Sequence, residues 1–182
     1  MAKLLVVVDM QNDFLTGALK NDEGVKVIPY IKEKLEKADK DTIVCFTRDT
    51  HFEDYMETEE GKNLPVKHCL YGTDGWQITD ELNPLKAGKV LPAGTYIFDK
   101  YTFGSQQFAA FLSENAAKID EIELVGVCTD ICVISNAILA KATLPNVPIY
   151  VDAAGCAGVT PESHKTAIEA MKACHIHIKN EK

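Results

Sequence analysis

Long hydrophobic runs are scarce in this sequence, and their scarcity excludes several classes of protein. The apolar stretch at residues 4–8 has only five residues before Asp9, which is too few for a secretory signal or a membrane-spanning helix. No block is rich in lysine or arginine, and 27 acidic against 19 basic side chains give a net charge of -8. An acidic balance disfavours nucleic-acid and anionic-membrane surfaces. We therefore expect a cytoplasmic protein that binds neither.

Cysteine pairs with CxxC spacing are also missing. The six cysteines are scattered, at positions 45, 69, 128, 132, 156 and 174. No two of them are separated by two residues, which argues against a zinc ribbon or a thioredoxin-type motif. In a cytoplasmic protein we expect all six to be reduced.

What is present is an alternation of strand and helix patterns. The 182 residues, 46% of them apolar, suit one domain spanning residues 1–182. Short, mainly apolar runs that suit buried parallel strands, the first of them rich in valine, occur at residues 4–9, 42–49, 95–100, 121–127, 147–153 and 175–178. Helical patterns lie between them, at about 27–38, 106–117, 130–144 and 160–174. The alternation predicts a doubly wound, Rossmann-like three-layer α/β/α domain with a mainly parallel six-stranded sheet.

Polar side chains gather where the predicted strands end. Open α/β sheets bind ligands outside the carboxyl ends of their strands. The residues expected at that edge are Asp9, Arg48, Asp49, His51, Asp99, Lys100, Cys128 to Cys132, and Asp152. An acid, a lysine and a cysteine would thus share one crevice. The irregular stretch between Thr50 and Gly94 is long enough that we expect it to be functional.

The sequence GVCTDICV, residues 126–133, places Cys132 in the first turn of a predicted helix. The positive end of the helix dipole and the free N–H groups there favour a thiolate and predict a low pKa for this cysteine. Cys132 is therefore the candidate nucleophile. The alternative, a small residue packed in the core, is retained for Cys45, Cys156 and Cys174.

Five motifs in order along the chain resemble those of one enzyme family. They are DMQNDF, RDTH, PVKHC, FDKYTFGS and GVCTDICV. Together they resemble the nicotinamidase and isochorismatase-like cysteine hydrolases, and the resemblance extends over essentially the whole chain. The sequence VISNAIL after Cys132 departs from the commoner pattern, as does a longer, glutamate-rich segment before PVKHC.

The resemblance implies a catalytic triad of Asp9, Lys100 and Cys132. Asp9 would accept and return a proton, Cys132 would form a thioester, and Lys100 would hold both charges in place. The backbone N–H groups of Cys128 and Cys132 would form the oxyanion hole, with a cis peptide bond between Val127 and Cys128.

A metal site is predicted beside the triad. Asp49 and His51 follow one strand end, and His68 comes from the next loop, which leaves room for water or substrate to complete the coordination. A divalent ion suits these ligands, with zinc as the first expectation and iron or manganese as alternatives. The resemblance implies a fourth ligand in some members. Here Glu60 is preferred and Glu57 is the alternative.

The resemblance also implies a substrate and an assembly. Nicotinamide is the expected substrate, bound beside Gln11 and Phe14, and a homodimer or homotetramer is the expected assembly. Alternatives are a hydrolase of another small amide or of a carbamoyl or ureido compound, and an isochorismatase. The histidines His51 and His68 weigh against the carbamoyl reading, and Cys132 weighs against the isochorismatase. A binding or scaffold protein with the same fold but no catalytic activity is a further alternative, because fold alone never establishes function.

Overall fold

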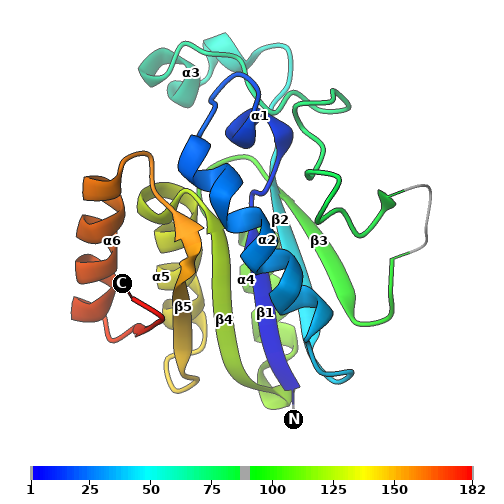
Figure 1. Cartoon of the computed structure of the whole chain (residues 1–182), viewed down its shortest axis with the longest axis vertical. Helices are drawn as coiled ribbons and strands as arrows, with labels where there is room; N and C mark the ends of the chain where they lie inside the picture. The colour runs from blue at the N-terminus through cyan, green and yellow to red at the C-terminus, as the bar shows by residue number, and fades with distance from the viewer. Residues whose placement is uncertain (1, 87–90, 182) are drawn as a thin grey trace.

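Six parallel strands form one sheet in the computed structural model, which describes residues 2–86 and 91–181 (Figure 1). The strands are β1 (Ala2–Val8), β2 (Ile43–Asp49), β3 (Thr95–Lys100), β4 (Ile119–Val127), β5 (Ile149–Ala157) and β6 (His177–Lys179). Their order across the sheet is β3-β2-β1-β4-β5-β6. The chain adds β2 and β3 on one side of β1 and then β4, β5 and β6 on the other. In doubly wound sheets, ligands bind in the crevice where the strand order reverses in this way. The predicted fold class is confirmed.

Alternate residues of β1 pack into two separate cores, because successive side chains of a strand point to opposite faces. Leu5 and Val7 pack with Leu15 and Ile31, which belong to the helices α1 (Asn12–Leu15) and α2 (Asp22–Glu36). Leu4, Val6 and Val8 face the opposite core. That core is closed by α4 (Gln106–Glu114), α5 (Ile134–Thr143) and α6 (Pro161–Ala173). Helices on both faces give the three predicted layers.

Helix boundaries follow the capping residues. Thr160 caps α6 in a reciprocal pair with Ser163, and Pro161 is the first helical residue. The start of α2 is Asp22 rather than the predicted Val27, because Asn21 accepts a hydrogen bond from the Gly24 N–H. Gly24, a poor helix former, lies in this first turn, so the sequence pattern does not indicate the earlier start. α4 ends at Glu114, and the 3₁₀ turn η3 (Ala116–Lys118) takes up the rest of the predicted helix.

Two strand predictions are corrected. β5 continues to Ala157, so Asp152 lies inside the strand and not at its carboxyl end. The continuation AAGCA is built from residues with weak strand preference, which is why it is missed. β6 begins at His177, and His175 lies outside it with a positive φ of 59°.

The first part of the irregular stretch after β2 lies beyond the carboxyl ends of the strands (Figure 1). It contains the 3₁₀ turn η1 (Tyr55–Glu57) and the short helix α3 (Glu59–Asn63). Isolated bridges tie His51 to Leu70, and Ile78 to Gln11 beyond β1. Among residues 2–86 and 91–181, no helix has the length and hydropathy needed to cross a membrane.

Candidate active site and metal site

Lys100 is the centre of a buried polar cluster at the carboxyl edge of the sheet. Its Nζ lies 2.7 Å from Asp9 Oδ2, 3.1 Å from Asp49 Oδ1 and 3.5 Å from Cys132 Sγ. Lys100 is paired with Asp49 in the parallel register of β2 and β3, and Asp9 follows directly after β1. Parallel strands end at one edge, so residues from β1, β2 and β3 meet there. The structure thus brings the three predicted triad residues together.

Asp9 has a backbone conformation that residues other than glycine rarely adopt. Its φ is 47° and it is fully buried. Thr47 Oγ1 donates a hydrogen bond to Asp9 Oδ1 over 2.7 Å, and the Asp9 N–H donates to the Thr47 carbonyl over 3.2 Å. Burial raises the pKa of Asp9, although Lys100 opposes the shift. A carboxylate with a raised pKa is a better proton acceptor at neutral pH.

The pKa of Cys132 is raised, whereas the sequence predicts a lowered one. Burial raises the pKa of this thiol well above its ordinary value, and the charge of Lys100 does not offset the burial. A hydrogen bond to Asp9 also favours the neutral thiol. Desolvation, which penalises a buried thiolate, outweighs the effect of the helix start. Burial and the neighbouring Asp9 carboxyl thus both raise the pKa of the Cys132 thiol.

The turn that carries Cys132 is a π-helical turn, η4 (Thr129–Val133), and α5 follows it directly. The peptide bond between Val127 and Cys128 is cis, as expected. Gly126 precedes this bond with a φ of 120°, and a Cβ there would lie 2.1 Å from the Val8 carbonyl oxygen. Only glycine fits this contact between β1 and β4. The neighbouring Cys128 is partly exposed, and burial raises the pKa of its thiol to about 12.

Four side chains converge beside the triad as a group of metal-ligand type. Asp49, His51, Glu60 and His68 each offer a ligand atom, and these atoms lie within 4.8 Å of one another. Of the two glutamates considered, Glu60 is the one that joins the group. Two imidazoles and two carboxylates are a donor set that zinc, iron and manganese accept. The residues therefore fit a divalent ion.

The charged side chains around Asp49 and His51 shift the pKa values of these two residues. Burial opposes ionisation of Asp49, but Lys100, His51 and His68 outweigh it and hold the pKa of its carboxyl well below the ordinary value. Burial likewise disfavours the charged form of His51, but hydrogen bonds to Asp49 and Glu60 raise its pKa to about 9. Asp49 contacts Lys100 through one oxygen and His51 through the other, at 3.1 and 2.9 Å. It thus joins the two predicted sites.

Local backbone structure holds the two histidines. The His51 N–H donates to the Cys69 carbonyl over 3.0 Å, and the His51 carbonyl accepts from the Tyr71 N–H over 2.8 Å. His68 Nδ1 lies 2.8 Å from the Val66 carbonyl oxygen. Donation from Nδ1 leaves Nε2 free to act as a ligand atom. The Tyr55 ring packs edge-on against both imidazoles.

Gln11, which is predicted to contact the substrate, directs its side chain to backbone groups. The residue is fully buried, and its side chain is used by backbone groups. Its Nε2 donates to the carbonyls of Asp49 and Trp76 over 2.8 and 2.9 Å, and its Oε1 accepts from the Asp49 N–H over 2.7 Å. Gln11 therefore positions Asp49. Phe14 is half-buried, and the centre of its ring lies 5.6 Å from that of His68. It therefore lies beside the metal-ligand group.

Three further residues hold parts of the site in place and are not predicted from the sequence. Thr47 holds Asp9, as described above. Asp13 accepts a 2.7 Å hydrogen bond from the N–H of Cys69, whose φ is 46°, and so fixes the loop after His68. Asn136 is fully buried and donates to the Cys132 carbonyl over 2.8 Å. The signal for Asn136 is a lone amide four residues after a cysteine in an apolar helix.

Comparisons with known proteins agree with this geometry. The family model described as the isochorismatase domain matches residues 3–180. A nicotinamidase from Schizosaccharomyces pombe is 26% identical, over 98% of this chain and 93% of its own length. The crystal structure of a pyrazinamidase from Pyrococcus horikoshii in complex with zinc has a TM-score of 0.80 and 29% identity, and covers 97% of both chains.

A pyrazinamidase/nicotinamidase from Streptococcus mutans has a TM-score of 0.85 and 26% identity, over 97% of this chain and 99% of that one. The similarity therefore spans the sheet, the irregular stretch and the cysteine turn together. The chain belongs to the isochorismatase family.

Proposed function

We propose that the protein hydrolyses nicotinamide to nicotinate and ammonia through a thioester on Cys132. One observation carries the proposal, namely the contacts of Lys100 with Asp9, Asp49 and Cys132. A single buried ammonium in contact with an acid, a thiol and a member of the metal-ligand group is an arrangement suited to nucleophilic catalysis. The names of the relatives, nicotinamidase and pyrazinamidase, support an aromatic amide as the substrate.

Acylation would begin with transfer of the Cys132 proton to Asp9. The sulfur would then attack the amide carbonyl carbon, and the carbonyl oxygen would take the negative charge. The backbone N–H groups of Cys128 and Cys132 are the proposed donors to that oxygen. Asp9 would return its proton to the amide nitrogen, so that the carbon–nitrogen bond breaks and ammonia leaves.

Deacylation would use the same groups in reverse. Asp9, again ionised, would take a proton from a water molecule as its oxygen attacks the thioester carbon. The carbon–sulfur bond would break, the acid would be released, and the proton would return to Cys132. Lys100 lies close enough to both Asp9 and Sγ to offset the negative charge as it moves between them.

Asp49, His51, Glu60 and His68 are the proposed holders of a divalent ion. When bound, such an ion would supply a Lewis-acid site for a ring nitrogen of the substrate. The converging donor atoms support this proposal, as does the zinc complex of the related pyrazinamidase. Phe14, which lies against the His68 ring, is the proposed wall for the substrate ring.

Ammonia release from nicotinamide by the purified protein tests the proposal. We expect release by the wild type, its loss in Cys132→Ala, and a fall after chelation that added zinc restores. Cys174→Ala is the matched control, because this cysteine is exposed at the end of α6. If the wild type releases no ammonia but Cys132 reacts with iodoacetamide, nicotinamide is the wrong substrate and other small amides and carbamoyl compounds should be screened. A thiol that does not react would instead favour a silent binding protein.

A further inference from the structure

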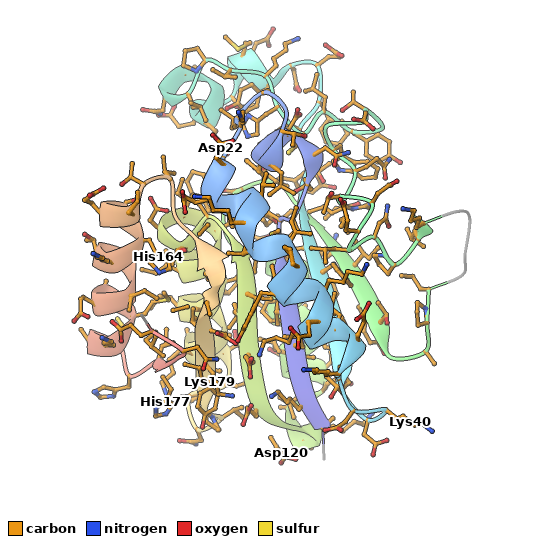
Figure 2. All side chains as sticks on the ribbon, viewed as in Figure 1. Asp22, Lys40, Asp120, His164, His177 and Lys179 are labelled. Atoms are coloured by element: carbon orange, nitrogen blue, oxygen red, sulfur yellow. The ribbon has the colours of Figure 1, made fainter. Side chains whose placement is uncertain are left out.

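Thr129 is a buried polar residue inside the catalytic turn that the proposed mechanism does not use. It lies between Cys128 and Cys132 and is fully buried. Its Oγ1 forms a 2.8 Å hydrogen bond with Nδ1 of His164, which is 35 residues away along the chain. Figure 2 shows His164 on the side of α6 that faces the sheet. A buried hydroxyl is costly without such a partner, so this bond fixes the position of Thr129 relative to α6.

The residue after Thr129 is attached to the same part of the chain. Asp130 Oδ1 accepts a 3.0 Å hydrogen bond from the Val159 N–H, in the connection between β5 and α6. Gly158 allows this connection to lie close to the helix, because a Cβ at that position would come 2.8 Å from the His164 backbone nitrogen. Two successive residues of the turn are thus tied to residues 158–164, which we call the β5–α6 segment.

A third contact ties the β5–α6 segment to the start of the turn. Asn21 Nδ2 donates to the Gly158 carbonyl over 2.9 Å and lies 3.9 Å from Cys128 Sγ. On the opposite side, Asn136 donates to the Cys132 carbonyl and to the Phe103 carbonyl, over 2.8 and 3.0 Å. The turn is therefore held from both sides, and the partly buried bond between Thr129 and His164 attaches it to α6.

We propose that His164 is a positioning residue that fixes, through Thr129, the backbone of the turn that would stabilise the oxyanion. The inference rests on the proposed cysteine mechanism. Neither Thr129 nor His164 is a member of the triad or of the metal-ligand group. Loss of the bond would let the N–H groups of the turn move, while the thiol, Asp9 and Lys100 keep their contacts. Donors aimed at developing charge act in the transition state and not in the ground state, so the loss should lower kcat more than it raises KM.

Two pairs of variants test the bond from both ends. Thr129→Val and His164→Ala remove it, whereas Thr129→Ser and His164→Asn keep a hydrogen-bonding atom in place. We expect the first pair to lower kcat by about 10-fold with little change in KM, which is less than the loss of a whole oxyanion donor. The second pair should recover most of the rate. The double variant Thr129→Val/His164→Ala should be no slower than the slower single variant, because both changes remove the same bond.

The matched control is Thr166→Val, which removes a hydroxyl from the exposed surface of α6. Two substrate-independent measurements accompany the kinetics. Hydrogen exchange of the peptide covering residues 126–134 should be faster in Thr129→Val and His164→Ala than in the control. The rate at which iodoacetamide alkylates Cys132 should be unchanged in all variants.

These readouts separate the inference from the proposed function. If the wild type releases no ammonia, the proposed function fails, and hydrogen exchange still tests the attachment of the turn. If the wild type is active, the inference is overturned by unchanged kcat in both bond-removing variants. It is also overturned if Thr129→Ser and His164→Asn fail to recover the rate, or if the effects of Thr129→Val and His164→Ala add in the double variant.

Discussion

Lys100 Nζ and Asp49 Oδ1 lie 3.1 Å apart, and this contact joins the proposed triad to the proposed metal site. Both residues end neighbouring parallel strands and are paired in the register of the sheet. The other oxygen of Asp49 lies 2.9 Å from His51 Nε2. One carboxylate thus faces an ammonium on one side and two imidazoles on the other, so a change in either site should affect the other.

Asp9 is expected to be needed for proton transfer rather than for binding. In Asp9→Asn the thiol proton has no acceptor, so kcat for ammonia release should fall by about 10²- to 10⁴-fold, the usual contribution of a general base. Alkylation of Cys132 by iodoacetamide should also slow. The control is Asp41→Asn in the exposed turn before β2. A variant with wild-type kcat would assign the base to another group.

Gln11 is expected to control metal affinity. Gln11→Ala removes three hydrogen bonds that hold the Asp49 backbone and the Trp76 carbonyl. Loss of such an outer partner costs about 10- to 100-fold in metal affinity. Zinc titration against a competing chelator measures the effect without any substrate. Asn12→Ala is the control, because it removes only an exposed hydrogen bond to the Asp74 carbonyl. Equal zinc affinity in Gln11→Ala and wild type would contradict the positioning role.

Gly126 is expected to be irreplaceable because of a steric contact as well as its φ. In Gly126→Ala the new Cβ would lie 2.1 Å from the Val8 carbonyl oxygen at a φ of 120°. We expect a loss of about 3 kcal/mol or more in the free energy of unfolding. Gly72→Ala is the matched control, since its φ is 81° but no atom lies within 4 Å of the added Cβ. It should cost only about 1 kcal/mol. Similar losses measured by urea denaturation would show that the contact with Val8 is relieved.

Glu123 should make stability depend on pH. This carboxylate is buried in β4, where burial disfavours its charge, but Lys179, Lys34 and Lys3 outweigh burial and lower its pKa to about 2. A folded-state pKa below the unfolded value of 4.5 gives stability that is present above pH 4.5 and is lost as the pH falls through about 2. The shift corresponds to about 3 kcal/mol at neutral pH.

Urea denaturation of the wild type and Glu123→Gln at a series of pH values measures this contribution. The wild type should be more stable at pH 7, and the difference should shrink below pH 4.5. Glu114→Gln serves as the control, because this glutamate is exposed at the end of α4. A difference that stays constant down to pH 3 would show that the charge of Glu123 has no role.

The sequence predicts the sheet and the polar edge because short apolar runs end at Asp9, Asp49 and Lys100. What it does not reveal depends on three-dimensional surroundings. The high pKa of Cys132 comes from burial by residues far away in sequence. The role of Gln11 depends on the backbone of Asp49, which is 38 residues further along the chain. The position of Asp152 inside β5 is hidden because alanine and glycine continue that strand.

In the proposed mechanism Cys132 becomes acylated during turnover. The direct test is mass spectrometry of the peptides recovered after acid quenching of the wild-type protein in the presence of nicotinamide. We expect a nicotinoyl group on the peptide that contains Cys132, in place of the thiol hydrogen, and no such group in Cys132→Ala. Ammonia release accompanied by a nicotinoyl group on Cys128 instead, or undiminished release by Cys132→Ala, would contradict it.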